Sequence, residues 1–213
     1  MNKRFALLAA LAAVALGASP SQAQTYGQYG GAAPIPSGSH LTGVYLNASD
    51  NLFGVLGQLR LSFYPGVDFG FQGGLARASF GSTNRTTLRL GTDLKARVRQ
   101  AGQTGPLDMA MGAHLGVETG DGYDILRLGP TFSVSAPVPF GQNSLFVPYA
   151  SLGISFNRLD TQFGQTSDFG YPLRFGGELK FAPQISFLAE MQINIHDDIN
   201  DSVEAAAGVN LPF

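Results

Sequence analysis

The sequence predicts an all-β fold: a single closed antiparallel transmembrane β-barrel of about ten strands, with eight as the alternative. Three observations predict it. Apolar and polar residues alternate from residue 41 onward, as in strands whose two faces meet different media. Charged residues are only 13% of the chain, whereas Gly reaches 28 of 213. No apolar run after residue 16 approaches the roughly 20 residues of a membrane-spanning helix.

The residues before the barrel divide into two parts. Two basic residues near the start precede an apolar run over residues 5–16, and the small residues Ser21 and Ala23 suit positions −3 and −1 of a cleavage site. We therefore expect a signal peptide over residues 1–23. Residues 24–40 are rich in Gly, Pro and Ser with no period, which predicts a short flexible segment. The barrel is expected over residues 41–213.

Ten alternating runs make up the predicted barrel. Most are long enough to cross a bilayer as tilted strands, which takes about 9–11 residues. In the third run Arg77 falls on the apolar face, so we expect a bulge at Gly73-Gly74. A soluble sandwich or lipocalin-like barrel is the alternative, but its outer face would carry abundant Lys, Glu and Thr. The runs cover about residues 41–48, 53–64, 67–80, 85–99, 106–119, 124–136, 145–158, 170–182, 184–196 and 202–213.

Charged residues on the polar faces predict ion pairs across neighbouring strands inside the barrel. One antiparallel register of the fourth and fifth runs opposes three pairs at once. They are Arg99 with Asp108, Asp93 with His114, and Arg89 with Glu118. A register between the third and fourth runs opposes Asp68 to Arg97, and a turn at residues 120–122 brings Arg127 near Glu118. The lumen is therefore expected to be narrow, neutralised and largely filled.

Glycines on the same polar faces leave two interpretations open. They allow close packing of the interior, or they leave a gap along a narrow conduit. A barrel of eight to ten strands has little free interior, which disfavours a general porin. The glycines are Gly70, Gly91, Gly112, Gly116, Gly129, Gly153, Gly176 and Gly208.

The last strand carries a resemblance to a known class. Residues 203–213 alternate and close on Phe213, with apolar residues at every second position before it. This resembles the C-terminal signal of bacterial outer-membrane barrels, and small OmpA- and OmpX-like barrels are the nearest class. The resemblance implies a place in the cell outer membrane, contact with its lipid, and recognition of the last strand by the barrel-assembly machinery through Phe213. Pro212 and the lack of Trp depart from the usual pattern.

Function is predicted less sharply than fold. We expect an envelope or structural role with other envelope proteins as further partners, and a narrow channel for small solutes as the alternative. A surface protease or lipid-modifying enzyme is the distant alternative, because His196, Asp197, Asp198 and Asp201 lie at one rim. A polar turn explains these residues more simply, so we expect no enzyme, cofactor or metal. With no Cys, no basic block and a net charge of −2, we expect no disulfide and no nucleic-acid partner.

The turns at the end opposite the termini are expected to be short. Residues 157–169 are the exception and the predicted external recognition surface, because function gathers on loops held by a rigid scaffold. So few long loops disfavour an adhesin.

Overall fold

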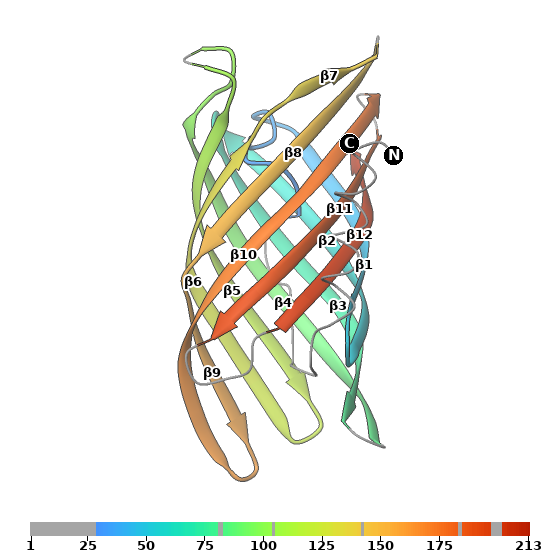
Figure 1. Ribbon diagram of the computed structural model, residues 1–213, viewed down its shortest axis with the longest axis vertical. Coiled ribbons are helices and arrows are strands. Elements are labelled where there is room, and N and C mark those ends of the chain that lie inside the picture. Colours follow the sequence, from blue (N-terminus) through green and yellow to red (C-terminus); the bar gives the residue numbers. More distant parts are fainter. Residues whose placement is uncertain (1–28, 81–82, 104, 142, 183–184, 197–201) are drawn as a thin grey trace, which may run out of the picture.

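The fold is a tall closed barrel of antiparallel strands that are tilted against its long axis (Figure 1). The computed structural model describes residues 29–80, 83–103, 105–141, 143–182, 185–196 and 202–213. Neighbouring strands of the wall are antiparallel and hydrogen-bonded, and β12 returns to pair with β1, so that the sheet has no open edge in the membrane. Within the described residues no helix is long and apolar enough to cross a membrane.

The strands match the alternating runs of the sequence closely. Their bounds are β1 (His40–Ser49), β2 (Leu52–Tyr64), β3 (Val67–Phe80), β4 (Thr83–Arg99), β5 (Asp108–Gly120), β6 (Tyr123–Ser135), β7 (Val138–Phe140), β8 (Ser144–Gly153), β9 (Ser155–Thr161), β10 (Gly164–Ala182), β11 (Ile185–His196) and β12 (Ser202–Pro212).

Together these strands run along the height of the barrel ten times, and we call each pass a crossing. This confirms the predicted number of ten. The seventh crossing is divided into β8 and β9, which both lie between β6 and β10. The division falls beside Pro130 of β6, which has no N–H to offer its neighbour. Ile154 instead donates its backbone N–H to the Pro130 carbonyl at 3.1 Å. β7 is a short strand that pairs only with β8, at the end of the barrel where β1 begins.

We call the end where β1 begins and β12 ends the terminal end, and the opposite end the far end. Two-residue turns need special backbone conformations at both ends. At the far end, Asp121-Gly122 joins β5 to β6, and Gly122 has a φ of 84° that favours glycine. At the terminal end, Pro65-Gly66 joins β2 to β3, and Gly66 has a φ of 78°.

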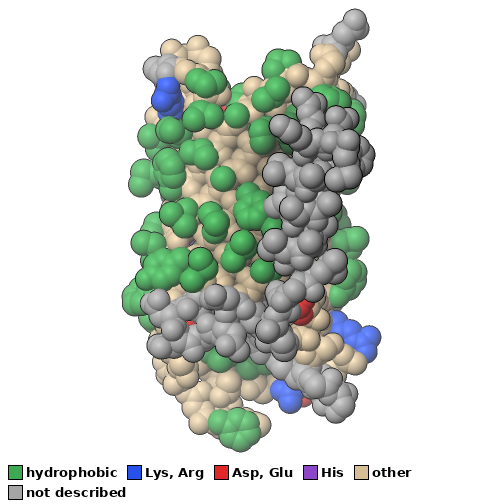
Figure 2. Space-filling model, viewed as in Figure 1, with side chains coloured by type: hydrophobic (Ala, Val, Ile, Leu, Met, Phe, Trp, Pro, Cys, Tyr) green, Lys and Arg blue, Asp and Glu red, His purple; other side chains and the backbone are tan. Residues whose placement is uncertain are grey.

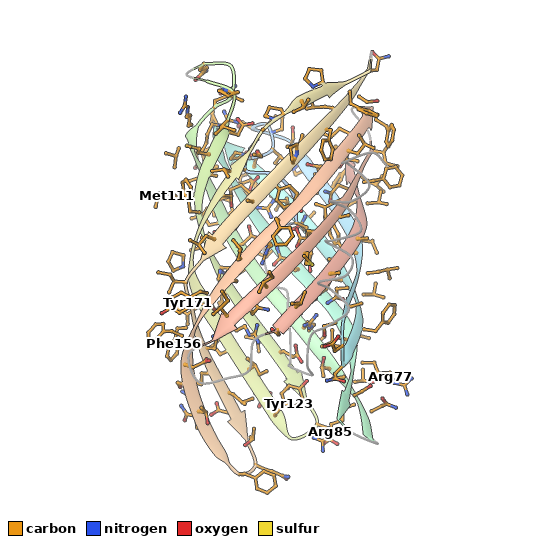
Figure 3. The ribbon with its side chains drawn as sticks, viewed as in Figure 1. Arg77, Arg85, Met111, Tyr123, Phe156 and Tyr171 are labelled. Atoms are coloured by element: carbon orange, nitrogen blue, oxygen red, sulfur yellow. The ribbon has the colours of Figure 1, made fainter. Side chains whose placement is uncertain are left out.

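Side chains alternate between a polar interior and an apolar exterior along every crossing. Hydrophobic side chains cover the visible side wall, and basic side chains lie near its ends (Figure 2). Met111, Phe156 and Tyr171 point away from the barrel (Figure 3). An outward apolar band is what a lipid environment requires of a barrel. Phe and Tyr take the place of Trp near its two borders. The exposed aromatic residues include Phe53, Phe63, Tyr64, Phe140, Phe146, Phe169, Phe181, Phe187 and Phe213.

The predicted bulge at Gly73-Gly74 is wrong. Residues 69–78 of β3 pair with β2 and β4 in one continuous register, so Arg77 does lie on the outward face. It lies near the far end, where its guanidinium clears the apolar band and points outward (Figure 3). Long basic side chains near a membrane border can reach the polar headgroups in this way. The register shifts occur instead at the terminal end of β2, β4 and β10.

Residues 157–169, predicted as an external loop, are mostly paired strand. β9 continues to Thr161 and β10 starts at Gly164, so the hairpin turns at Gln162-Phe163 and projects beyond the other far-end turns (Figure 1). Phe163 at its tip is 91% exposed. Any recognition surface formed by residues 157–169 is therefore the tip of a paired hairpin.

Because the outer face of the wall meets lipid, the cost of placing a charge on that face should depend on its depth in the membrane. Replacing Leu90, an exposed residue at the middle of β4, by Arg should lower the free energy of unfolding by about 2–4 kcal/mol, because a charge would face the hydrocarbon. Thr86→Arg is the matched control, on the same face of β4 but nearer the far end, and should cost about 0–1 kcal/mol. Unfolding by denaturant from lipid vesicles measures both, and equal losses would contradict this membrane placement.

Candidate functional site

The barrel interior gathers most of the buried polar side chains of the described chain. They come from every crossing and point inward because they alternate with the lipid-facing residues. The buried charged residues are Arg60, Asp68, Arg89, Asp93, Lys95, Asp108, Glu118, Arg127, Asp168, Arg174, Glu178, Glu190 and Glu204. The lumen is therefore the candidate functional site.

The first charge network centres on Arg60 of β2. Its Nη2 lies 2.5 Å from Asp68 Oδ1 and 2.7 Å from Asp93 Oδ1, and its Nη1 lies 3.2 Å from Asp93 Oδ2. Gln72 donates to the same Asp93 carboxylate at 2.5 Å. Arg60 is only 2% exposed, so its charge depends on these carboxylates for compensation.

A glycine makes this network possible. Arg60 lies opposite Gly70 on β3, and Gly70 lies opposite Asp93 on β4. A Cβ at Gly70 would lie 2.2 Å from the Asp93 carboxylate and 2.7 Å from the Arg60 guanidinium. The missing side chain thus lets an arginine and an aspartate two strands apart meet over it, and sequence reasoning on adjacent strands alone missed Arg60.

The second charge network centres on Arg89 of β4 and lies closer to the far end. Arg89 Nε contacts Glu118 Oε2 at 2.9 Å on the adjacent strand, in the register that the sequence predicted. Arg89 Nη1 also lies 3.6 Å from Glu204 on β12, at another part of the wall. Tyr123 donates to Glu118 at 2.6 Å, and Asn47 donates to Glu204 at 2.5 Å. The network therefore links β4 and β5 to β12 and β1 through the lumen.

Two predicted pairings are wrong. Asp68 lies opposite Lys95 and not Arg97, because the β3–β4 register is displaced by two residues from the predicted one. Arg97 instead donates to Gln100 at 2.8 Å. Arg99 lies opposite Met109 and not Asp108, because a register shift lies between Arg97 and Arg99.

The remaining predicted residues do not form the simple cross-strand ion pairs that the sequence predicted. Asp108 accepts a hydrogen bond from the backbone N–H of Ala101 at 2.8 Å in the β4–β5 turn. Asp93 lies opposite His114 as predicted, but its carboxylate contacts Arg60 and Gln72. Arg127 lies opposite Gly116. The predicted ladder is thus replaced by two networks and a separate cavity.

That cavity lies between the middle of the lumen and the far end. It has about 20 Å³ of water-accessible volume, which is room for about one water molecule. Its lining is polar and carries His114, Arg127 and Arg174 together with neutral amide and hydroxyl side chains. Arg174 donates to Gln192 at 2.8 Å within this lining.

Residues 29–39 belong to the segment predicted to be a flexible lead-in; residues 29–35 lie inside the terminal half of the barrel, and residues 36–39 lie at its rim beside the end of β2 (Figure 1). They have no regular secondary structure, as their composition suggests, but side chains of the wall hold their backbone. Lys95 donates to the Gly31 carbonyl at 2.9 Å, and Ile35 N–H donates to Asp68 at 2.9 Å. Residues 24–28 of the predicted segment and the predicted signal peptide lie outside the described residues.

The innermost described residue of this segment is Tyr29, which is only 2% exposed. Its ring stacks on Tyr45 with centroids 4.1 Å apart. The two tyrosines form a buried layer with Leu56, Tyr149, Leu188 and Ala206. Tyr149 donates its hydroxyl hydrogen to Glu190 at 2.6 Å, and Tyr45 hydrogen-bonds Asn210. We call this cluster the aromatic layer; it extends along the wall from β8 to β2, with Tyr29 packed against it inside the lumen.

The rim group that suggested an enzyme lies largely outside the described residues. His196 ends β11, but its side chain and residues 197–201 lie outside the described structure. Among the side chains that are described, no three His, Asp or Glu residues are placed to hold a metal ion.

Comparison with known proteins agrees with the fold. The outer membrane protein beta-barrel domain family matches residues 6–213, so the chain belongs to this family and is a protein of the bacterial outer membrane. No curated protein matches.

Solved structures of other outer-membrane barrels are similar in fold at low sequence identity. The beta domain of the Bordetella autotransporter BrkA is 11% identical, with a TM-score of 0.53 over 83% of this chain and 100% of that one. A bacterial polysaccharide outer membrane secretin is also 11% identical, with a TM-score of 0.50 over 76% of this chain and 57% of that one. The N-terminal barrel of Pseudomonas aeruginosa OprF is 10% identical, with a TM-score of 0.39 over 84% of this chain and 100% of that one.

The Arg60 network predicts a large cost for breaking a buried ion pair. Arg60→Met should lower the free energy of unfolding by about 3–5 kcal/mol, because Asp68 and Asp93 would lose their buried guanidinium. Arg158→Met is the matched control, because Arg158 pairs with Asp160 at 3.1 Å where both are nearly half exposed. It should cost about 0–1 kcal/mol. Denaturant unfolding compares them, and similar losses would mean that water reaches the Arg60 network.

Proposed function

We propose that this outer-membrane barrel has an envelope or structural role and that its lumen is closed in the resting state. The observation that carries the proposal is the pairing of Arg60 and Arg89, each at most 2% exposed, with carboxylates inside the barrel. Residues 29–35 add a second obstruction in the terminal half.

The physical argument concerns hydration. A guanidinium that lines an open pore keeps water around it, whereas a buried one must find its partners within the protein. Both arginines have such partners at 2.5–2.9 Å. A ten-stranded barrel is also narrow, and water-filled channels belong to barrels of about 16–18 strands. Together these points support a filled lumen over a general pore.

A narrow channel for small solutes is the second candidate. The far-end cavity favours it, because polar side chains around a water-sized space are suited to a hydrated path. Tyr29 opposes it, because its ring packs against the aromatic layer inside the lumen.

We propose no catalytic role for this chain. A surface protease or lipid-modifying enzyme stays the distant alternative because of His196 and the acidic residues that follow it. An activity that disappears in His196→Ala with the barrel still folded would favour that alternative.

The proposed partners follow from the outer surface. Outer-membrane lipid contacts the apolar band, and the barrel-assembly machinery would recognise the outward face of β12. Phe213 lies at its end, 70% exposed, with its ring stacked on His40 at 5.4 Å between centroids. Other envelope proteins would meet the barrel at its polar ends.

The closed lumen predicts that the protein does not form a large conducting pore. In planar bilayers, the purified wild-type barrel should give no stable conductance of general-porin size, because its interior charges are paired and its terminal half is occupied. A trimeric general porin prepared in the same detergent is the positive control. A large, stable and ungated current from the wild-type protein would refute the proposed closed state.

The assembly role of the last strand predicts a selective defect. Phe213→Ala should fold in detergent but accumulate less in the outer membrane, because the substitution removes an outward aromatic from β12 without touching the lumen. Phe63→Ala, another exposed aromatic at the terminal end, is the matched control and should insert normally. Heat-modifiable gel mobility of outer-membrane fractions measures insertion, and equal insertion of both variants would remove the proposed signal.

A further inference from the structure

Residues 29–35 reach from one side of the lumen to the other. On one side, Lys95 of β4 and Asp68 of β3 hold the Gly31 carbonyl and the Ile35 N–H, each at 2.9 Å. On the other side, Ala32 N–H donates to Ser135 Oγ of β6 at 3.0 Å. A Cβ at Gly31 would lie 3.0 Å from Val147 of β8, so the segment packs closely against that wall.

The segment also completes the aromatic layer. Of the residues in that layer, Tyr29 alone comes from outside the strands; the others belong to β1, β2, β8, β11 and β12. Beyond Tyr29 lies the water-sized cavity at His114, Arg127 and Arg174. On the terminal side, a cavity of about 330 Å³ opens between Pro34, Ile35 and the wall at Glu178 and Lys180. Tyr29 and the backbone around it therefore separate two spaces within one lumen.

The attachment of the segment differs from that of the wall. Residues 29–39 take no part in the sheet, and Gly30, Gly31, Pro34 and Pro36 make strand pairing unfavourable there. Side-chain hydrogen bonds hold residues 29–35, whereas each strand of the wall is held by two backbone ladders. Residues 29–35 can leave without breaking a backbone ladder, whereas Gly38 and Ser39 stay bonded to the backbone of Ser62 on β2. An interior that houses an extended chain is wide enough for water and small ions once that chain has left.

We propose that residues 29–35 are a displaceable plug, and that its withdrawal through the terminal end opens a narrow polar path for small ions and hydrophilic solutes. This adds a conditional function to the closed barrel. In the plugged state Tyr29 closes the aromatic layer. In the open state the terminal cavity and the far-end cavity become continuous, while Arg60 and Arg89 keep their ion pairs with Asp68 and Glu118 on the adjacent strands of the wall.

A reversible cross-link tests the plug directly, because the chain contains no Cys. A Cβ at Gly31 would lie 3.4 Å from the Cβ of Ser135, close to the separation of about 3.5–4.5 Å in a disulfide. The variant Gly31→Cys/Ser135→Cys therefore locks the segment to β6 when oxidised and frees it when reduced. The two single-cysteine variants are its controls.

A release variant changes only the segment and leaves the wall intact. Ala32→Pro removes the N–H that donates to Ser135, and Ile35→Pro removes the N–H that donates to Asp68, while Tyr29 keeps its ring. In planar bilayers, Ala32→Pro/Ile35→Pro should raise the frequency of small conductance steps by about tenfold or more over wild type. Adding the oxidised cross-link should abolish these steps, and a reductant should restore them.

The outcomes separate this proposal from the closed barrel itself. The plug would be overturned if the release variant is folded, as judged by heat-modifiable gel mobility, yet gives no more conductance steps than wild type. That result would not affect the proposal of a closed barrel. Steps that persist unchanged under the oxidised cross-link would also overturn it. A large stable pore in the wild-type protein would instead overturn the closed barrel.

Discussion

The pairing of β1 with β12 is the interaction on which the rest of the structure depends. In hydrocarbon an unpaired backbone N–H or carbonyl has no water to bond, so the sheet must close on itself. Leu41 to Ala48 pair with Pro212 to Ala205 without a register shift. Once closed, the wall has one face toward lipid and one toward the lumen, and successive residues along each strand face the two in turn. The apolar exterior and the crowded polar interior both follow from this closure.

Inside the closed wall, charge is compensated over distances longer than one strand spacing. Arg60 reaches Asp93 over Gly70, and Arg89 of β4 approaches Glu204 of β12. Such contacts tie together parts of the wall that share no backbone ladder. They favour one arrangement of the barrel over others with shifted registers, because a shift by one residue would turn every one of these charges toward lipid.

Period-two alternation was sufficient to predict the fold, the number of crossings and most strand bounds, because lipid and lumen select opposite residue types at adjacent positions. It also predicted the register at Arg89 and Glu118. It could not predict the ion pair of Arg60 with Asp93, because the Arg60 side chain passes over Gly70 of β3 to reach β4, two strands away. It placed Arg99 wrongly, because a register shift within β4 leaves no mark in the pattern. The lumenal position of residues 29–35 was invisible, because a segment without regular structure has no period.

The continuity of this segment with β1 has a consequence for the order of assembly. Residue 39 leads directly into the strand that seals the barrel against β12. The leading segment must therefore enter the interior while the seam is still open, or thread through the terminal mouth after the seam has closed. In the first case the wall folds around its own occupant, and the arrival of the segment and the last strand pairing are one event. In the second, an empty barrel exists for a time as a folding intermediate.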